Sequence, residues 1–146
     1  MKKENRSLKW GFLAFLFLAC SPKVQEIEYG TDGCHFCSMT IVDRQHASQL
    51  VTHKNKAFKF DAVECMVNHL KEADNTTIAL FLANDYNAPG EFIDATRATY
   101  LISKEIPSPM GAFLTAFATK EEAVQTLSEH QGEIFTWDEL LDHFNK

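Results

Sequence analysis

Residues 58–70 combine a strand pattern with a helix pattern in the run Phe58-Lys59-Phe60-Asp61-Ala62-Val63-Glu64-Cys65-Met66-Val67-Asn68-His69-Leu70. The first three residues alternate between apolar and polar, which is typical of a half-buried strand. Asp61 with Glu64 three residues later matches a capping box, so we predict that Asp61 N-caps a helix. Apolar residues then recur at helical spacing and form one stripe, which consists of Val63, Met66, Val67 and Leu70. The expected helix covers residues 62–73.

The segments next to this helix are predicted to be mainly strands. Upstream, β-prone residues indicate strands at 40–42 and 50–52, and residues 53–56 are typical of a turn that leads into the strand at 58–60. Downstream, a continuous apolar run predicts a strand over 76–83, and a loop follows over 84–90.

The second part of the chain repeats this order of elements with little residue identity. Its expected strands are 96–102, 112–118 and 133–135, with a proline-containing loop at 103–109. Two further capping boxes predict helices that end near residues 130 and 144, and they are formed by Thr119 with Glu122 and by Thr136 with Glu139. The expected fold class is α+β, with two small similar halves, about 31–90 and 91–146. Each half has strands, a helix and a further strand, and the two pack as one compact unit.

The N-terminal residues 1–19 have the organisation of a secretory signal peptide. A positively charged start precedes an apolar run from Trp10 to Ala19, which is shorter than the roughly 20 residues of a membrane-spanning helix. The run ends before Cys20 and resembles a bacterial lipobox, with Phe17 where Leu is usual. We expect lipidation at Cys20, a tether over 20–30 and a domain over 31–146. The alternative is cleavage elsewhere, which leaves Cys20 as a free thiol.

The charge of the chain argues against nucleic acid as a partner. Its 146 residues include 14 Lys and Arg against 20 Asp and Glu, which gives a net charge of −6. Removal of the basic signal peptide makes the chain more acidic, and such a chain lacks the basic surface that a phosphate backbone requires. Membrane attachment is therefore expected through the N-terminal lipid, in the bacterial cell envelope, facing the periplasm or the exterior.

The segment Cys34-His35-Phe36-Cys37-Ser38-Met39 carries most of the recognisable chemistry. Thiolate and thioether sulfurs are soft ligands, and a site that adds Met to Cys favours Cu(I), whereas zinc sites rarely use Met. In extended backbone, the side chains of Cys37 and Met39 would lie on the same side of the chain, so that both sulfurs could reach one ion. The metal expected from these residues is Cu(I).

Cys34 and Cys37 also form a C-x-x-C pair, which has other interpretations. A thioredoxin-type redox pair would open a helix, but the residues after Cys37 are β-prone. Ser38 replaces the His of a c-type haem motif, and the chain has no second C-x-x-C for a zinc knuckle. A disulfide stays open as well, including Cys34–Cys65 or Cys37–Cys65, because three thiols besides Cys20 are an awkward number outside the cytoplasm.

Three further positions could contribute to a metal site. His35 can ligate through a ring nitrogen, although a histidine in a loop is more often solvated. Cys65 and His69 are four residues apart on the predicted helix, a spacing that can hold a metal, but an exposed His69 is the expectation. Met110 follows two prolines and precedes Gly111, so it is either presented to a ligand or fills a gap in the core.

The order and spacing of these residues resemble the NosL family of copper-binding lipoproteins, which are accessory proteins of nitrous oxide reductase. The likeness covers nearly the whole mature chain and, besides Cys20, rests on His35-x-Cys37-x-Met39, Phe60-Asp61, Ser108-Pro109-Met110-Gly111-Ala112 and Gly132-Glu133-Ile134. The resemblance implies a pair of related α+β halves and a Cu(I) site formed by Cys37 and Met39, with Met110 and His35 as further ligands. Cys34 and Cys65 depart from the minimal family pattern, and the roles expected for them are a changed coordination number or redox control.

We therefore expect a membrane-anchored Cu(I) metallochaperone, not an enzyme, that delivers copper to an extracytoplasmic copper enzyme. The expected partners are nitrous oxide reductase, an enzyme of denitrification, and a copper exporter. The expected metal ligands are Cys37, Met39, Met110, His35 and Cys34, with Cys65 next to the ligands or in a disulfide. Two other functions stay open: a thiol–disulfide oxidoreductase that uses Cys34 and Cys37, and a structural lipoprotein with a disulfide.

Overall fold

The structure is a computed structural model, and it describes residues 21–146. The expected signal peptide over 1–19 and the lipidation site Cys20 lie outside the described residues. Within residues 21–146, no helix has the length and apolar character needed to cross a membrane.

The first sheet is antiparallel, with strand order β2-β1-β3-β4. Its strands are β1 (Ser48–Thr52), β2 (Ala57–Phe60), β3 (Ile78–Asp85) and β4 (Ala88–Asp94). The hairpin between β1 and β2 turns at residues 53–56, as predicted, and Asn55 has φ 61° there, a left-handed conformation that asparagine tolerates better than most residues.

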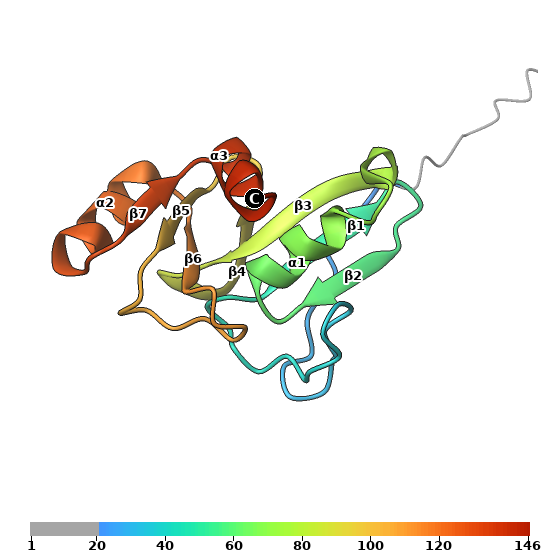
Figure 1. Cartoon of the computed structure of the whole chain (residues 1–146). Coiled ribbons are helices and arrows are strands. Elements are labelled where there is room, and N and C mark those ends of the chain that lie inside the picture. Colours follow the sequence, from blue (N-terminus) through green and yellow to red (C-terminus); the bar gives the residue numbers. More distant parts are fainter. Residues whose placement is uncertain (1–20) are drawn as a thin grey trace, which may run out of the picture.

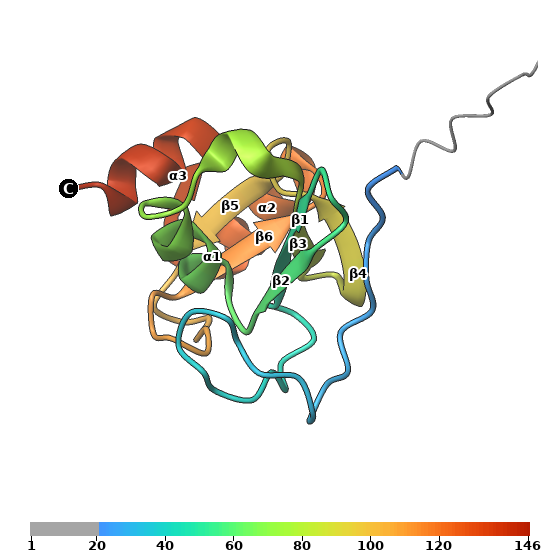
Figure 2. The same ribbon diagram turned by 90° about the vertical axis from the view of Figure 1, so that its right-hand side faces the viewer.

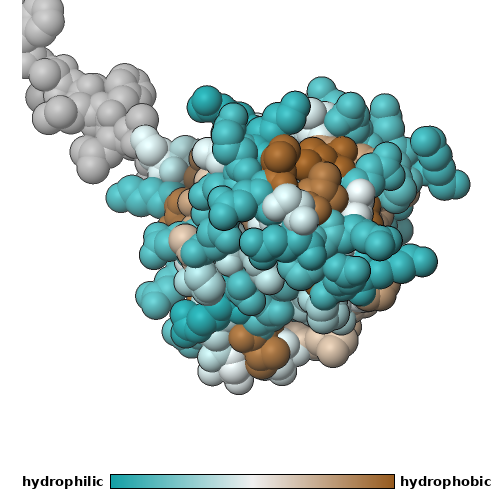
Figure 3. Space-filling view, turned by 90° about the vertical axis from the view of Figure 1, so that its left-hand side faces the viewer, coloured by the Kyte–Doolittle hydropathy of each residue, from teal (hydrophilic) through white to brown (hydrophobic). Residues whose placement is uncertain are grey.

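The second sheet is antiparallel, with strand order β6-β5-β7. Its strands are β5 (Thr99–Ile102), β6 (Leu114–Phe117) and β7 (Glu133–Phe135). Helices α2 (Lys120–Glu129) and α3 (Trp137–Phe144) both begin with the predicted capping boxes, which are complete in the structure. The face of the molecule over α2 and β7 is mainly hydrophilic, with separate hydrophobic patches (Figure 3).

Helix α1 (Val63–Leu70) joins the two sheets into one unit (Figures 1 and 2). It packs on β1 and β2 of the first sheet, on β6 of the second sheet and on α3. Its predicted apolar stripe is buried and belongs to the larger of two core clusters, whose members range from Ile27 to Leu140. A short 3₁₀ helix, η1 (Asn75–Thr77), connects α1 to β3. The elements therefore form the expected α+β fold as one compact unit.

Two predictions of local structure were wrong. Residues 40–42 are not a strand, because only an isolated bridge joins Thr40 to Gly33. Residues 84–90 are not a loop, because β3 extends to Asp85 and a tight turn leads directly into β4. Strand β4 lies on an edge of the sheet, where proline and glycine are tolerated, and its proline and glycine hide the strand pattern in the sequence. The strand β4 crosses the expected boundary between the halves at residue 90.

The capping box predicted for the first helix was also wrong. The N-cap of α1 is Ala62, no side chain caps it, and the helix ends at Leu70 instead of residue 73. Asp61 and Glu64 are instead buried at 2% exposure each, and both make contacts with distant parts of the chain. These contacts position the candidate site.

Candidate metal centre

Three cysteines and one aspartate converge at the start of α1. The sulfurs of Cys34, Cys37 and Cys65 and a carboxylate oxygen of Asp61 all lie within 4.8 Å of one another. Cys34 is 3% exposed and Cys65 is 1% exposed, whereas Cys37 is only partly buried. All three cysteines are free thiols. We call these four residues the thiol cluster.

A tight backbone loop presents Cys34 and Cys37. The Cys34 N–H donates to the Met39 carbonyl at 2.7 Å, and the Ser38 N–H donates to the Cys34 carbonyl at 2.9 Å. Ser38 has φ 65°, so the backbone between Cys37 and Met39 is left-handed and not extended. The expectation that extended backbone places these two side chains on one side was therefore wrong.

Strand β2 and α1 supply the rest of the cluster. The His35 N–H donates to the Lys59 carbonyl at 2.8 Å, which fixes the cysteine loop on β2. The Lys59 ammonium also contacts the Asp32 carboxylate at 2.6 Å, and this contact lowers the pKa of Asp32. Asp61 follows β2 directly, and its Oδ1 accepts the Cys37 thiol at 3.6 Å. Cys65 enters from the first turn of α1, two residues after its first residue.

The electrostatics of the cluster favour one thiolate beside two thiols. The Cys65 thiol donates to the sulfur of Cys34, and this hydrogen bond is the main cause that lowers the pKa of Cys34 to about 6. Hydrogen bonds from three backbone N–H groups lower the pKa of Cys34 further, and they come from Cys37, Asp61 and Phe36. The hydrogen bond between the two thiols raises the pKa of Cys65, and burial raises it further. For Cys37, burial is the main cause of a raised pKa. The hydrogen bonds to Cys34 thus favour its thiolate form, a soft ligand, in a mostly enclosed place.

The two candidate methionines are exposed near this cluster. Met39 is 54% exposed and Met110 is 41% exposed, which is unusual for an apolar side chain and excludes the role of core filler for Met110. In both ribbon views the loop that follows β5, which contains Met110, lies beside the segment 28–47 that contains the cysteine loop (Figures 1 and 2). Gly111 in this loop has φ 76°, a left-handed backbone conformation that glycine adopts without strain.

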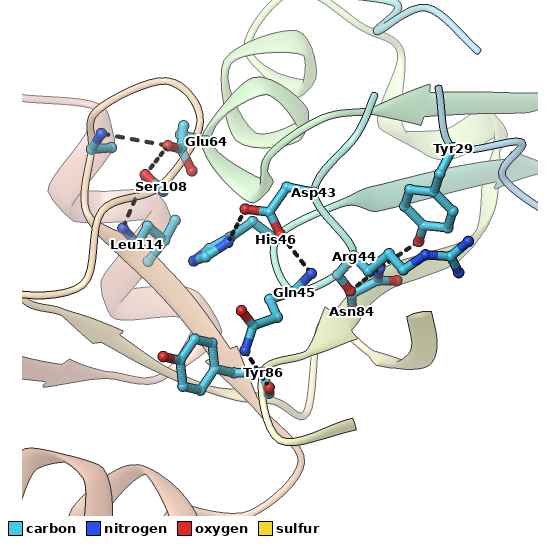
Figure 4. Close-up of polar contacts among 11 residues, drawn as sticks. Tyr29, Asp43, Arg44, Gln45, His46, Glu64, Asn84, Tyr86, Ser108 and Leu114 are labelled. Atoms are coloured by element: carbon cyan, nitrogen blue, oxygen red, sulfur yellow. Dashed lines mark hydrogen bonds and ion pairs between the residues drawn. The ribbon is translucent and has the colours of Figure 1, made fainter. Parts of the chain in front are cut away.

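A buried hydrogen bond attaches the Met110 loop to α1. The Ser108 hydroxyl donates to Glu64 Oε1 at 2.5 Å, and the Ala112 N–H lies 3.4 Å from the same oxygen (Figure 4). The other oxygen, Oε2, is buried without a partner among the described residues. Because Glu64 precedes Cys65, this contact ties the Met110 loop to the residue next to the thiol cluster.

A second polar network holds the end of segment 28–47 on the strands (Figure 4). The Asn84 amide donates to the Tyr29 hydroxyl at 2.6 Å and to the Arg44 carbonyl at 2.7 Å. Asp43 Oδ2 pairs with the His46 ring at 2.9 Å, and this contact lowers the pKa of Asp43. The segment is therefore attached at both ends, although it contains little regular structure.

The two histidines considered as ligands lie outside the thiol cluster. The rings of His35 and His69 are 5.1 Å apart, and both contact the ring of Phe58, with His35 at 4.6 Å and His69 at 5.4 Å. Burial lowers the pKa of His69, which is partly buried and not exposed as expected. The pair forms an aromatic group between β2 and α1.

The structure thus unites some of the expected site residues and adds others. It brings Cys34, Cys37 and Cys65 together and adds Asp61, which the sequence suggested only as a helix cap. It also identifies Glu64 and Ser108 as the contact behind Met110. For Asp61 and Glu64, the capping-box spacing directly after the predicted strand 58–60 was the only sign in the sequence that either residue had a structural role.

Comparisons with known proteins give a consistent result. A family model described as NosL matches residues 26–144. A curated copper-binding lipoprotein NosL from Stutzerimonas stutzeri is 27% identical over 143 residues, which cover 88% of this chain and 75% of that protein. The crystal structure of the copper chaperone NosL from Shewanella denitrificans matches with a TM-score of 0.69 and 22% identity, over 80% of this chain and 94% of that chain. The structural match confirms the expected fold.

The relatives also bear on the choice between an enzyme and a binding protein. They are described as a copper-binding lipoprotein and a copper chaperone, not as enzymes, which confirms the expectation of a non-enzyme. The geometry agrees, because Cys34 and Cys37 lie in a turn and not at the start of a helix, where a thioredoxin-type pair would be. The three free thiols also leave the described chain without the disulfide considered above.

Proposed function

Because this chain belongs to the NosL family, we propose that it is a Cu(I)-binding metallochaperone anchored in the bacterial cell envelope by a lipid on Cys20. The observation that carries this proposal is the cluster of three free cysteines beside two exposed methionines. Thiolate and thioether sulfurs together favour Cu(I) over harder ions.

The proposed primary ligands are Cys37 and Met39, with Met110 as a third. Cys37 is the most exposed of the three clustered cysteines, and both methionines are more than 40% exposed, so a partner protein can reach them. The Glu64–Ser108 contact supports Met110 as a ligand, because it holds the Met110 loop against α1. His35 is a further candidate, since its exposed ring lies on the same short loop. Cys34 supports the site by accepting the Cys65 thiol.

Transfer of copper follows from this ligand set. A methionine thioether carries no charge and donates weakly, so that a Cu(I) ion bound by one thiolate and one or two thioethers keeps room for a ligand from a partner. The ion can then pass from one protein to another by ligand exchange, without a change in oxidation state. The proposed acceptor is nitrous oxide reductase, which would place the protein in denitrification, and a copper exporter is the proposed donor.

Cu(I) titration of the reduced protein against a chromophoric Cu(I) chelator tests the ligands. We expect one tightly bound Cu(I), with affinity lowered at least tenfold in Cys37→Ala and by a smaller factor in Met39→Ala. Val42→Ala is the matched control, because Val42 is an exposed apolar residue of the same segment at 68% exposure and has no sulfur. Failure of the protein to compete with the chelator, or unchanged affinity in both variants, contradicts the proposal.

A second experiment tests the acceptor. Copper-loaded protein is mixed with copper-depleted nitrous oxide reductase, and the copper content of the enzyme is measured after separation. We expect transfer from the protein and little transfer from the Met110→Ala variant. Equal uptake from free Cu(I) and from the loaded protein would contradict delivery to this enzyme, while the binding site itself would stand.

A further inference from the structure

We propose that Cys34 and Cys65, together with Cys37, form a second, inner Cu(I) site behind the exposed Met39 and Met110 site. The inference rests on the proposed function in two respects, namely that the metal is Cu(I) and that Cys37 is a ligand. It turns two residues that depart from the minimal family pattern into ligands. Cu(I) would therefore have two positions in this protein, an outer one for exchange and an inner one for holding.

The burial of the sulfurs defines the two positions. Cys34 and Cys65 are 3% and 1% exposed, so a partner protein cannot reach them directly. Cys37 is only partly buried, so it is the one of the three thiols that solvent and a partner can reach. It is therefore the one cysteine that can ligate a metal in both positions.

The spacing of the sulfurs fits a single small ion. Three ligands at about 2.3 Å from one metal, spread evenly in a plane, lie about 4.0 Å from one another. The three sulfurs already lie within 4.8 Å of one another, so a movement of less than about 1 Å closes the set around Cu(I).

The contacts of the cluster favour Cu(I) over zinc. Three sulfurs complete a trigonal set for Cu(I), but structural zinc sites take four ligands. A zinc ion would need the Asp61 carboxylate as its fourth ligand, and Oδ1 of that carboxylate accepts the Cys37 thiol.

The passage between the two sites is a ligand exchange. A bond from Cu(I) to a methionine thioether breaks as a bond to a cysteine sulfur forms, and the copper stays monovalent throughout. Each thiol that becomes a ligand gives up its proton to water. The reverse passage returns the proton and exposes the ion to a partner.

Two double variants of the full chain separate the sites. Met39→Ala with Met110→Ala removes the outer thioethers, and we expect it to keep one bound Cu(I) whose X-ray absorption shows three sulfur neighbours. Cys34→Ser with Cys65→Ser removes the inner thiols, and we expect its Cu(I) affinity to fall at least tenfold. Met66→Leu is the control, because Met66 is a buried sulfur residue adjacent to Cys65 that lies outside the cluster.

The outcomes distinguish this inference from the proposed function. If the cysteine variant binds Cu(I) as tightly as the unmodified protein, the inner site is overturned and the outer site stands. If the methionine variant binds no Cu(I), or if Zn(II) fills its cluster and Cu(I) does not displace it, the inner site is also overturned. If the unmodified protein binds no Cu(I), both proposals fail. Should the cysteine variant not fold, the sulfur count in the methionine variant still decides.

Discussion

Replacing the buried Ser108 by Ala should destabilise the protein. The hydroxyl donates to Glu64, whose side chain is 2% exposed. In Ser108→Ala the carboxylate would keep only the long contact from the Ala112 N–H at 3.4 Å, and its second oxygen already has no partner among residues 21–146. A buried acceptor that loses its donor retains the full cost of its desolvation.

The expected loss follows from that contact. A hydrogen bond to a charged group contributes about 1.5–3 kcal/mol. The Leu114 N–H, which lies 3.4 Å from the Ser108 hydroxyl, also loses its partner and adds a smaller cost. We expect the free energy of unfolding to fall by about 2–3 kcal/mol, which for a domain of this size lowers the melting temperature by roughly 8 °C.

Urea unfolding followed by circular dichroism measures this loss. Ser128→Ala is the matched control, because the Ser128 hydroxyl donates to the Gln125 carbonyl on the exposed surface of α2 and should change stability by no more than about 0.5 kcal/mol. Repeating Ser108→Ala in a Glu64→Gln background should give a cost smaller by about 1 kcal/mol, since residues in direct contact are coupled.

Hydrogen exchange reports whether the Met110 loop opens. The Gly111 N–H donates to the Ser108 carbonyl at 3.0 Å, so its protection should fall in Ser108→Ala while protection in α2 is retained. A loss below about 0.5 kcal/mol, equal to that of Ser128→Ala, would refute the assignment of Glu64 and Ser108 as the contact that holds this loop.

Three further predictions concern packing, capping and pH. Gly132→Ala should cost more than about 2 kcal/mol in urea unfolding, because its new Cβ would lie 2.5 Å from the Ile102 carbonyl, whereas Gly33→Ala meets nothing within 4 Å and should leave packing intact. Thr119→Ala removes the cap of α2 and should cost about 1 kcal/mol, and an unchanged midpoint would contradict the capping assignment. The lowered pKa of Asp43 stabilises the fold above the unfolded pKa of about 3.9, and this contribution disappears as the pH falls through the folded pKa. His46→Phe removes the partner of Asp43, so its unfolding free energy should fall less between about pH 5 and pH 3 than that of the unmodified protein. An equal fall in both proteins would contradict the pairing.

Local sequence patterns predicted elements best where the interactions that form them are local. The capping boxes at Thr119 and Thr136 join residues three apart, and both form as predicted. The same pattern at Asp61 and Glu64 failed because each carboxylate has a partner far along the chain, at Cys37 and Ser108. Sequence spacing does not reveal that competition, and the tertiary contact overrides the local cap.

For the metal site too, local features could be predicted from the sequence, whereas features that depend on distant contacts could not. The chemistry of Cys34, Cys37 and Met39 is visible from residue types alone, as are their softness and their preference for Cu(I). Their geometry is not, because a left-handed Ser38 replaces the expected extended backbone. The position of Cys65 depends on how α1 packs across two sheets, and no pattern within residues 58–70 specifies that packing.

The attachment of the first described residues to the β1–β2 hairpin determines how the molecule would face a membrane. The Lys23 N–H donates to Asn55 Oδ1 at 2.9 Å, and the Gln25 amide donates to the Asn55 carbonyl at 2.9 Å. With the proposed lipid on Cys20, two residues separate the anchor from Lys23, a reach of about 10 Å. The hairpin tip, with exposed Lys54 and Lys56, would then rest close to the lipid headgroups.

Strand β2 leads away from that tip (Figure 1), and Asp61, which belongs to the thiol cluster, directly follows its last residue. At about 3.3 Å per residue, the strand separates them from the hairpin tip by more than about 10 Å. With the hairpin tip on the headgroups, the short segment between the proposed lipid and Lys23 would leave the thiol cluster facing the aqueous space. Proteins that exchange copper with it would have to meet it there, and a membrane-embedded donor would need a part that projects beyond the headgroups.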